Sequence, residues 1–493
     1  MLNLLAFDYG ASSGRAMLGG YDGSRLNLNE IHRFPNEPVT VGGSLYWDIL
    51  RLYHEMKQGI LKCSAGGCKD IASIGIDTWG VDFGLLDASG KLLGNPFHYR
   101  DDHTQGMIEE ACKVVPGKDI YAKTGIAFQV FNSLYQLLAM KKDNSPLLEK
   151  ADTMLFIPDL LRYFLTGEKN NEYTIASTSQ MLDAHTGNWA ADLLSKLGIP
   201  QNILPGLVDA GTVAGKLTAG VAGELGIGQV PVTAVAEHDT GSAVVSVPAH
   251  GDKYAYISSG TWSLLGVESA LPVINDATFR LNYSNEGGFN RSARLLKNIM
   301  GLWIYQECKR TWDKSGEAAS FDELEAGASQ SEAFMAFIDV DDSSFFSPGK
   351  MPEKVREYCG RTGQKIPGTK PQIVRCIMES LAMKYRMALE GLEKIIGYKI
   401  PVLYIIGGGC KNTMLSQFTA NAIARPVITG LVEATAVGNL VAQLIALGEV
   451  KNLEEGRRLV RSSFPSVEYA PQDTDGWNEA YRKFLGIVDS NII

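Results

Sequence analysis

Apolar and polar positions follow two different periods along this chain, and together they predict an α/β protein. Short apolar runs at Leu2–Asp8, Ile71–Asp77 and Val402–Ile406 end in glycine or polar turns, as buried strands do. Apolar residues recur at helical spacing through Trp47–Lys62 and again through a long segment from Ile373 to Ile396. Strands that alternate with helices in both halves of a chain are typical of the α/β class.

Two strand pairs with a small, Gly-containing tip stand near the start of each half. Each has an apolar arm, a tip and a return arm: Leu2–Asp8, Gly10–Gly14 and Arg15–Gly19 in the first, and Tyr254–Ser258, Ser259–Thr261 and Trp262–Val267 in the second. This placement predicts a duplicated domain. We expect a sugar-binding domain at residues 1–247 and a nucleotide-binding domain at 248–493, with the boundary in the loop around Pro248–Asp252.

One long stretch carries no clear period. Residues 339–368 are rich in Asp, Ser, Pro and Gly, and this composition predicts a long surface loop.

Composition narrows the class of protein. The 493 residues are 45% apolar and 20% charged, which suits a folded enzyme of two large domains. The net charge of −9 argues against nucleic acid as a partner, because phosphate backbones need a basic surface. Seven cysteines, an odd number with no C-x-x-C spacing, favour a reduced cytosolic protein.

Neither a signal peptide nor a membrane span is expected. Asp8 interrupts the N-terminal apolar run, and the apolar stretch at Leu431–Leu447 contains Glu433, Asn439 and Gln443. We therefore expect a cytoplasmic protein with no membrane partner, in which Leu431–Leu447 is a buried helix.

The common nucleotide motifs are absent, since neither a P-loop nor a Rossmann fingerprint occurs. The tip of the first hairpin offers another way to bind phosphate: small residues admit backbone N–H groups, Ser12 and Ser13 add hydroxyls, and Arg15 adds charge. Asp8 could hold Mg²⁺ through water. An ordinary glycine turn explains the same residues.

Three further segments could carry chemistry, each beside a plainer explanation. Thr78–Asp82 could pack Trp79 on a sugar and offer Asp82 to its hydroxyls, or Trp79 could be core and Asp82 a turn residue. Ser259–Thr261 could clasp nucleotide phosphates, or be a plain turn. Gly407–Gly409 could receive adenine or ribose, although a tight turn needs only one glycine.

The segment Val235–Ala243 joins an apolar strand to a helix rich in small residues. Asp239 is well placed to accept a proton from a substrate hydroxyl as that hydroxyl attacks a phosphoryl group. A helix cap is the alternative, but it leaves Glu237 and His238 unexplained. Whether Glu237 tunes Asp239 or caps the turn stays open.

Taken in order, these segments resemble the FGGY carbohydrate kinases of the actin/hexokinase superfamily over nearly the whole chain. The segments that carry the resemblance are Asp8–Arg15, Gly75–Phe83, Tyr99–Asp101, Phe131–Leu137, Ile157–Asp159, His238–Thr240, Ser258–Leu264, Asn285–Gly288, Leu296–Trp303, Gly407–Asn412 and Val432–Thr435.

The resemblance implies two actin-like (ribonuclease H-like) domains flanking a deep catalytic cleft. It implies transfer of phosphate from ATP to the C1 hydroxyl of L-rhamnulose, with Asp239 as the base and Mg²⁺ accompanying the nucleotide near Asp8. The implied ATP contacts are Ala11, Ser12, Ser13, Gly14, Arg15, Thr261, Gln306 and Gly408. The implied sugar contacts are Gly80, Asp82, His238, Asp239, Thr240 and Asn298.

Other functions stay open at this point. L-fuculose or another ketose could be the acceptor, and a non-catalytic sugar-binding regulator could share the fold. An actin-like ATPase is disfavoured, because no separate client-binding domain is evident. We expect a monomer or a homodimer.

Overall fold

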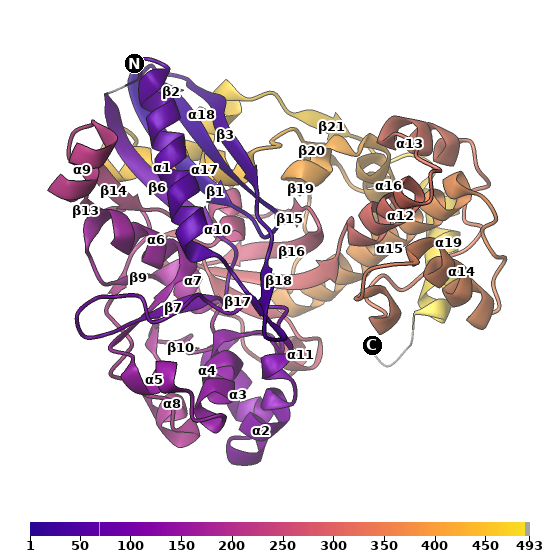
Figure 1. Cartoon of the computed structure of the whole chain (residues 1–493). Helices are drawn as coiled ribbons and strands as arrows, with labels where there is room; N and C mark the ends of the chain where they lie inside the picture. The colour runs from indigo at the N-terminus through magenta and orange to yellow at the C-terminus, as the bar shows by residue number, and fades with distance from the viewer. Residues whose placement is uncertain (69, 489–493) are drawn as a thin grey trace. The chain divides into compact units, whose positions relative to one another are not determined.

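The computed structural model describes residues 1–68 and 70–488 (Figure 1). Its chain divides into two compact units that each take in several stretches of sequence. The first comprises Met1–Pro248, Glu268–Leu295 and Ala434–Ser463, and the second comprises Ala249–Val267, Leu296–Glu433 and Phe464–Ile493. The predicted boundary at residue 247 stays a prediction, and each unit is described separately.

The first unit is built on a six-stranded sheet with the strand order β13-β14-β6-β1-β2-β3. Its central strands β14, β6 and β1 run parallel, whereas β1, β2 and β3 form an antiparallel meander. The bounds are β1 (Leu2–Tyr9), β2 (Ser13–Tyr21), β3 (Leu26–Pro35), β6 (Ile71–Thr78), β13 (Thr212–Lys216) and β14 (Pro231–Ala234).

Helices cover both faces of this sheet. Helix α1 (Ile49–Ala65) crosses one face, where its Gly59 backbone lies against Phe7 and Ala16, and α17 (Ala434–Ala446) lies behind the strands on the other face (Figure 1). On β1 this leaves Phe7 facing α1, and the alternate residues, including Asp8, facing the opposite side.

The other elements of the first unit surround this core. They are β4 (Val39–Val41), β5 (Ser44–Tyr46), β7 (Phe83–Leu86), η1 (Asp102–Thr104), α2 (Met107–Val114), α3 (Gly117–Thr124), α4 (Ser133–Lys142), α5 (Pro146–Lys150), β8 (Thr153–Phe156), α6 (Ile157–Thr166), β9 (Asn171–Glu172), α7 (Tyr173–Ser177), β10 (Leu182–Asp183), β11 (Asn188–Trp189), α8 (Ala191–Leu197), β12 (Leu207–Val208), α9 (Ala219–Leu225), α10 (Asp239–Val245), α11 (Asp276–Arg280), β17 (Ser284–Gly287), η2 (Phe289–Arg291) and α18 (Leu453–Ser463).

The second unit repeats the plan of the first. Strands β18-β16-β15-β19-β20 lie in the same order as β3-β2-β1-β6-β14. In the second unit β15 pairs antiparallel with β16 and parallel with β19. In the first unit β1 likewise pairs antiparallel with β2 and parallel with β6. The bounds are β15 (Ala255–Ser259), β16 (Trp262–Ser269), β18 (Ala293–Met300), β19 (Leu403–Ile406), β20 (Val427–Thr429) and β21 (Val467–Tyr469), and the division between the units falls within β16 and β18.

Helix α15 (Lys370–Ile396) is the long helix that the spacing from Ile373 to Ile396 predicted. The Thr369 side chain caps its start, and Gly397, in a left-handed conformation, ends it. The remaining elements of this unit are α12 (Trp303–Lys314), α13 (Phe321–Ser329), η3 (Ser343–Phe345), α14 (Met351–Arg361), η4 (Gly408–Lys411), α16 (Thr413–Ile423) and α19 (Thr474–Ile487).

The prediction of a long surface loop at residues 339–368 is wrong. Residues Met351–Arg361 form α14, which buries Met351, Val355 and Tyr358 along one face. Pro352 stands in the first turn, where a missing N–H costs nothing. Most of the Gly and Pro residues that suggested a loop flank the helix or begin it, and Gly360 lies in its last turn. As for membranes, no helix in the described part of the chain is both long enough and apolar enough to form a span.

We predict that the close approach of α10 to α17 is sensitive to volume. A Cβ added at Gly438 would lie 1.8 Å from the backbone oxygen of Ser242. Gly438→Ala should therefore lower the free energy of unfolding by about 1–3 kcal/mol, because the two helices must move apart. Gly223→Ala is the matched control, since a Cβ there meets nothing within 4 Å. It should leave stability equal or raise it by up to about 1 kcal/mol. Equal denaturation midpoints for Gly438→Ala and the unchanged protein would contradict this packing.

Candidate active site

Acidic residues gather at one edge of the first unit's sheet. In the parallel pairing of β1 with β6, Asp8 lies beside Asp77. A bridge then joins Thr78 to His238, and Asp239 follows as the first residue of α10. The carboxyl ends of parallel strands are where α/β proteins place their ligands. Asp239, predicted to lie at a strand–helix junction, therefore ends on the same edge as Asp8, as does Asp77, to which the sequence assigned no role.

The first hairpin tip carries the residues Ala11–Arg15 that were predicted to contact ATP. Arg15 donates from Nε to Asp8 Oδ2 at 3.0 Å, which offsets the charge of this buried carboxylate. The tip is held from one side by Asn36, whose backbone N donates to Ser12 O and whose side chain donates to Gly10 O. Gly14 is required, because a Cβ there would lie 2.2 Å from the Phe34 ring.

Asp77 is fully buried and has a single amide partner. Asn439 Nδ2 donates to Asp77 Oδ2 at 2.6 Å, while Oδ1 has no hydrogen-bond partner among the described residues. Burial, and then the nearby Asp8 carboxylate, raise the pKa of Asp77 well above its usual value. The only sequence signal for Asp77 was a carboxylate at the end of a strongly apolar strand.

Asp239 binds its neighbours through one carboxylate oxygen. Its Oδ1 accepts from Thr240 N at 2.5 Å and from Thr240 Oγ1 at 3.2 Å, and lies 3.3 Å from His238 Nε2. The side chain is 32% exposed, so a substrate can reach it. His238 occupies the cap position of α10 without a side-chain cap bond, so Asp239 is not the helix cap.

His238 is fixed from behind by an ion pair. Arg294, fully buried, reaches His238 Nδ1 at 3.0 Å and Glu286 Oε2 at 3.1 Å through Nη2. Glu286 Oε2 also lies 3.2 Å from His238 Nδ1, so Arg294 and Glu286 both hold the ring through Nδ1 and leave Nε2 directed at Asp239. Although burial raises it, the pKa of Glu286 is held below its usual value by His238 and Arg294. The sequence placed Glu286 in a motif but gave no reason to expect Arg294.

Glu237 neither caps the turn nor faces Asp239. Its Oε1 accepts from Arg162 Nε at 2.8 Å, and both side chains are fully buried. Its backbone carbonyl accepts from Thr78 N at 2.9 Å, which ties the turn to the end of β6.

The loop after β6 adopts a strained conformation. Val81 has φ 69°, a left-handed value that β-branched residues rarely adopt. Thr178 Oγ1 accepts from Val81 N at 3.1 Å, and Ser133 Oγ donates to Val81 O at 2.5 Å, so the surrounding side chains hold the strain. Gly80 packs with its Cα against Thr178.

Asp82 is buried among donors. Its Oδ2 accepts from the indoles of Trp47 at 2.6 Å and Trp79 at 2.9 Å and from Tyr99 N at 3.2 Å, and its Oδ1 accepts from Gln136 at 2.9 Å. Burial, opposed by these donors, raises the pKa of Asp82 to about 7. Trp79 is buried and packs against Trp47 with ring centroids 4.1 Å apart, so it is a core residue. The predicted contact of Asp82 with a sugar stays a prediction.

In the second unit, three of the predicted ATP contacts lie around the second hairpin. Thr261 Oγ1 donates to Gln306 Oε1 at 3.4 Å, and Thr261 O accepts from Gly301 N at 3.1 Å. A Cβ on Gly409 would lie 2.0 Å from Ser259 Oγ, whereas at Gly408 it would meet nothing within 4 Å. The glycine run thus packs against the hairpin and leaves Gly408 open. Asn298 lies on β18.

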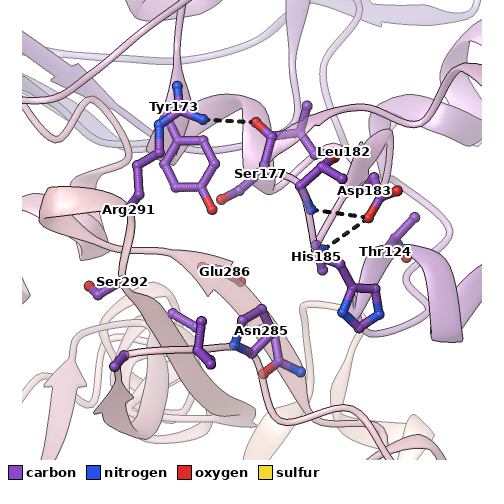
Figure 2. A pocket seen from close by; sticks show the side chains of 17 residues that line it. Thr124, Tyr173, Ser177, Leu182, Asp183, His185, Asn285, Glu286, Arg291 and Ser292 are labelled. Atoms are coloured by element: carbon purple, nitrogen blue, oxygen red, sulfur yellow. Dashed lines mark hydrogen bonds between the residues drawn. The ribbon is translucent and has the colours of Figure 1, made fainter.

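A separate pocket of about 170 Å³ opens in the first unit (Figure 2). Tyr173, His185 and Asn285 point into it, and Glu286, the partner of His238, forms part of its wall. None of the predicted sugar-binding side chains in this unit lines it.

The residues at the sheet edge suit Mg²⁺ only as an ion that comes with a phosphate ligand. Within residues 1–68 and 70–488, no three His, Cys, Asp or Glu side chains form a direct metal site. Mg²⁺ usually keeps several waters and takes one or two carboxylates together with substrate phosphates. Asp8, buried at the end of β1 beside the hairpin tip, fits that arrangement.

Comparison with known proteins decides the family. The models of the N-terminal and C-terminal domains of the FGGY family of carbohydrate kinases match residues 3–246 and 255–447. The chain belongs to this family. A protein named rhamnulokinase from Bacteroides thetaiotaomicron is 46% identical over 486 residues, covering 99% of each chain. Another from Oceanobacillus iheyensis is 42% identical over 472 residues, covering 96% of this chain and 99% of its own.

Membership of the FGGY family confirms the predicted fold and makes the protein a sugar kinase. A xylulose kinase structure from Lactobacillus acidophilus superimposes with a TM-score of 0.82 at 17% identity, covering 99% of this chain and 98% of that one. At that identity the likeness concerns the fold alone. It confirms the two-domain, actin-like α/β architecture that the family resemblance implied.

We predict that Asp82 titrates close to neutrality and that its two indole partners report the change. Intrinsic fluorescence should show a transition near pH 7, which Asp82→Asn should abolish, because ionisation alters the field at Trp47 and Trp79. The folded protein binds this proton more tightly than the unfolded chain, whose Asp pKa is about 3.9. The protonated Asp82 side chain therefore contributes its full share to the free energy of unfolding below about pH 4, and this contribution is lost as pH rises through 7.

Asp87→Asn is the matched control, because Asp87 is a partly exposed loop carboxylate whose described donors are Ser89 and Lys91 and not an indole. The same transition in Asp82→Asn as in the unchanged protein would exclude Asp82 as its source.

Proposed function

We propose that this FGGY kinase transfers the γ-phosphoryl group of ATP to the C1 hydroxyl of L-rhamnulose, with Asp239 as the general base. The observation that carries the proposal is the environment of Asp239. One of its carboxylate oxygens lies against Thr240 and His238, and the side chain is 32% exposed. The sugar is taken from relatives named rhamnulokinase that are 46% and 42% identical over almost their full length.

The proton transfer follows from the charge at Asp239. A sugar hydroxyl is too weak an acid to lose its proton to a carboxylate in the ground state. As the hydroxyl oxygen attacks the loose phosphoryl transition state, its acidity rises and Asp239 accepts the proton. Thr240 and His238 lie at Oδ1, so we assign Oδ2 to the substrate.

The sugar contacts extend from the same turn. His238 and Thr240 flank the base, and Gly80, packed against Thr178 beside the strained loop at Val81, is assigned to the sugar by its motif. We assign Asn298 to the sugar by its motif alone. In this proposal Asp82 holds the indoles of Trp47 and Trp79 through Oδ2. Its Oδ1 accepts one hydrogen bond from Gln136 and would accept a second one from a sugar hydroxyl.

The nucleotide contacts are the backbone N–H groups and hydroxyls of Ala11–Ser13, Gly14 and Arg15, with Thr261, Gln306 and Gly408. Each hairpin tip offers small residues that let the backbone approach phosphate. Mg²⁺, when bound with ATP near Asp8, would neutralise phosphate charge.

Asp239→Asn should lower kcat with L-rhamnulose and Mg-ATP by about 100- to 10,000-fold, because the amide cannot accept the proton. The KD for ATP should stay unchanged, because Asp239 holds sugar and not nucleotide in this proposal. A coupled ADP assay and calorimetric ATP titration measure the two quantities. Asp252→Asn, in an exposed loop, is the matched control and should behave as the unchanged enzyme. Near-normal turnover by Asp239→Asn would exclude this residue as the base.

The acceptor is tested by the same assay across L-rhamnulose, L-fuculose, D-xylulose, L-ribulose and glycerol. We expect the highest kcat/KM for L-rhamnulose, with ³¹P–¹H correlation placing the phosphate on C1. A higher kcat/KM for another ketose would keep the assignment as a sugar kinase and make that ketose the proposed substrate.

A further inference from the structure

Four ionisable side chains lie fully buried behind the turn that carries His238 and Asp239. Asp159 and Arg162 come from α6, Glu172 precedes α7, and Glu237 belongs to the turn itself. Arg162 donates to Glu237 through Nε at 2.8 Å, to Asp159 through Nη2, and to the Asn170 side chain through Nη1. One guanidinium thus faces three carboxyl groups, and burying unbalanced charge is costly.

Glu172 has its oxygens occupied. They accept from Thr174 N at 2.8 Å, Thr174 Oγ1 at 2.6 Å, Ile175 N at 3.1 Å and Glu237 N at 3.1 Å. Burial raises the pKa of Glu172 to about 8, against the pull of these donors. Glu172 therefore has no oxygen left to bridge to another carboxyl.

Asp159 and Glu237 each keep one oxygen without a donor. Asp159 Oδ1 accepts from Arg162 and from Glu172 N, and Glu237 Oε1 accepts from Arg162. Asp159 Oδ2 and Glu237 Oε2 have no hydrogen-bond donor among the described residues, and the two carboxyl groups lie near each other because Nη2 and Nε of one guanidinium bind them. Two ionised carboxylates would leave both oxygens unpaired and repelling each other, whereas one proton between them satisfies both.

We infer that Asp159 and Glu237 share a single buried proton, and that this carboxyl pair, clamped by Arg162, is a positioning device for His238 and Asp239. The turn is held by backbone as well. Glu237 N donates to Glu172, His238 N donates to Thr174 Oγ1 at 3.3 Å, and Glu237 O accepts from Thr78 N. The link to catalysis rests on the proposed role of Asp239, and the shared proton does not.

Amide substitutions test the shared proton, because an amide mimics a protonated carboxyl of the same shape. In Glu237→Gln the amide nitrogen takes the place of Oε2 and donates to Asp159, and Asp159→Asn works in the reverse direction. Either single variant should fold with near-wild-type stability at neutral pH. The double variant places two NH₂ groups face to face, so its loss should exceed the sum of the single losses. Additive losses in this double-mutant cycle would overturn the inference.

Two measurements detect the proton without any assay of activity. The infrared difference between the unchanged protein and Glu237→Gln should show loss of one protonated-carboxyl C=O band. The folding constant of the unchanged protein should fall about tenfold per pH unit relative to Glu237→Gln, starting near pH 4, because only the folded state holds the proton. Arg162, Glu172 and His238 are the other charged or titratable groups around the pair, and all stay in place in both proteins. An unchanged band and parallel pH curves would overturn the inference.

Kinetics then test positioning. Glu237→Ala, which leaves Arg162 and Asp159 without their partner, should lower kcat by about 10- to 100-fold through displacement of Asp239. Its KM for ATP should not change. Glu237→Gln should recover most of that loss, and its kcat should be less sensitive to alkaline pH. Glu224→Gln, an exposed carboxylate paired with Lys57, is the matched control. Equal kcat in Glu237→Ala and the unchanged enzyme would exclude positioning.

Failure of the proposed function gives a different result. An unchanged protein that phosphorylates none of the ketoses would count against the kinase assignment to L-rhamnulose, while the infrared band, the pH curves and the double-mutant cycle would still decide the shared proton.

Discussion

Repulsion between carboxylates is the constraint that organises the first unit. Parallel pairing of β1 with β6 puts Asp8 and Asp77 side by side, and the bridge from Thr78 to His238 brings Asp239 to the same sheet edge. Three carboxyl groups at one sheet edge repel one another when ionised, so each needs its own partner or a raised pKa. The structure gives each one a different partner: Arg15 for Asp8, the Asn439 amide for Asp77, and Thr240 with His238 for Asp239.

These different partners produce different chemistry from one residue type. Asp77, with burial and a neutral amide, holds a raised pKa and lies in the core. Asp239, partly exposed and fixed by donors at one oxygen, is suited to receive a proton. Buried arginines also compensate carboxylates behind the site. Arg294 contacts Glu286 and His238, and Arg162 binds Asp159 and Glu237. Two buried guanidiniums therefore support the turn that carries the proposed base.

Local features of the structure could be predicted from the sequence and long-range ones could not. The hairpins, the helix that ends at Ile396 and the junction before Asp239 were predicted from the spacing of apolar residues and the positions of glycines. These features depend mainly on residues that are close in sequence. Helix α14 was missed because Pro352 and the flanking glycines outweighed the spacing of Met351, Val355 and Tyr358. Arg162 lies 75 positions from Glu237, and no local pattern pairs residues so far apart.

The central claim, that Asp239 accepts the proton of the C1 hydroxyl, is tested most directly by a crystal structure. The enzyme would be crystallised with L-rhamnulose, Mg²⁺ and a non-hydrolysable ATP analogue. Our account predicts that Asp239 Oδ2 lies within hydrogen-bond reach of the C1 hydroxyl, about 2.6–3.2 Å away, with Oδ1 still bound to Thr240. A C1 hydroxyl paired with a different ionisable side chain, with Asp239 out of reach, would contradict it.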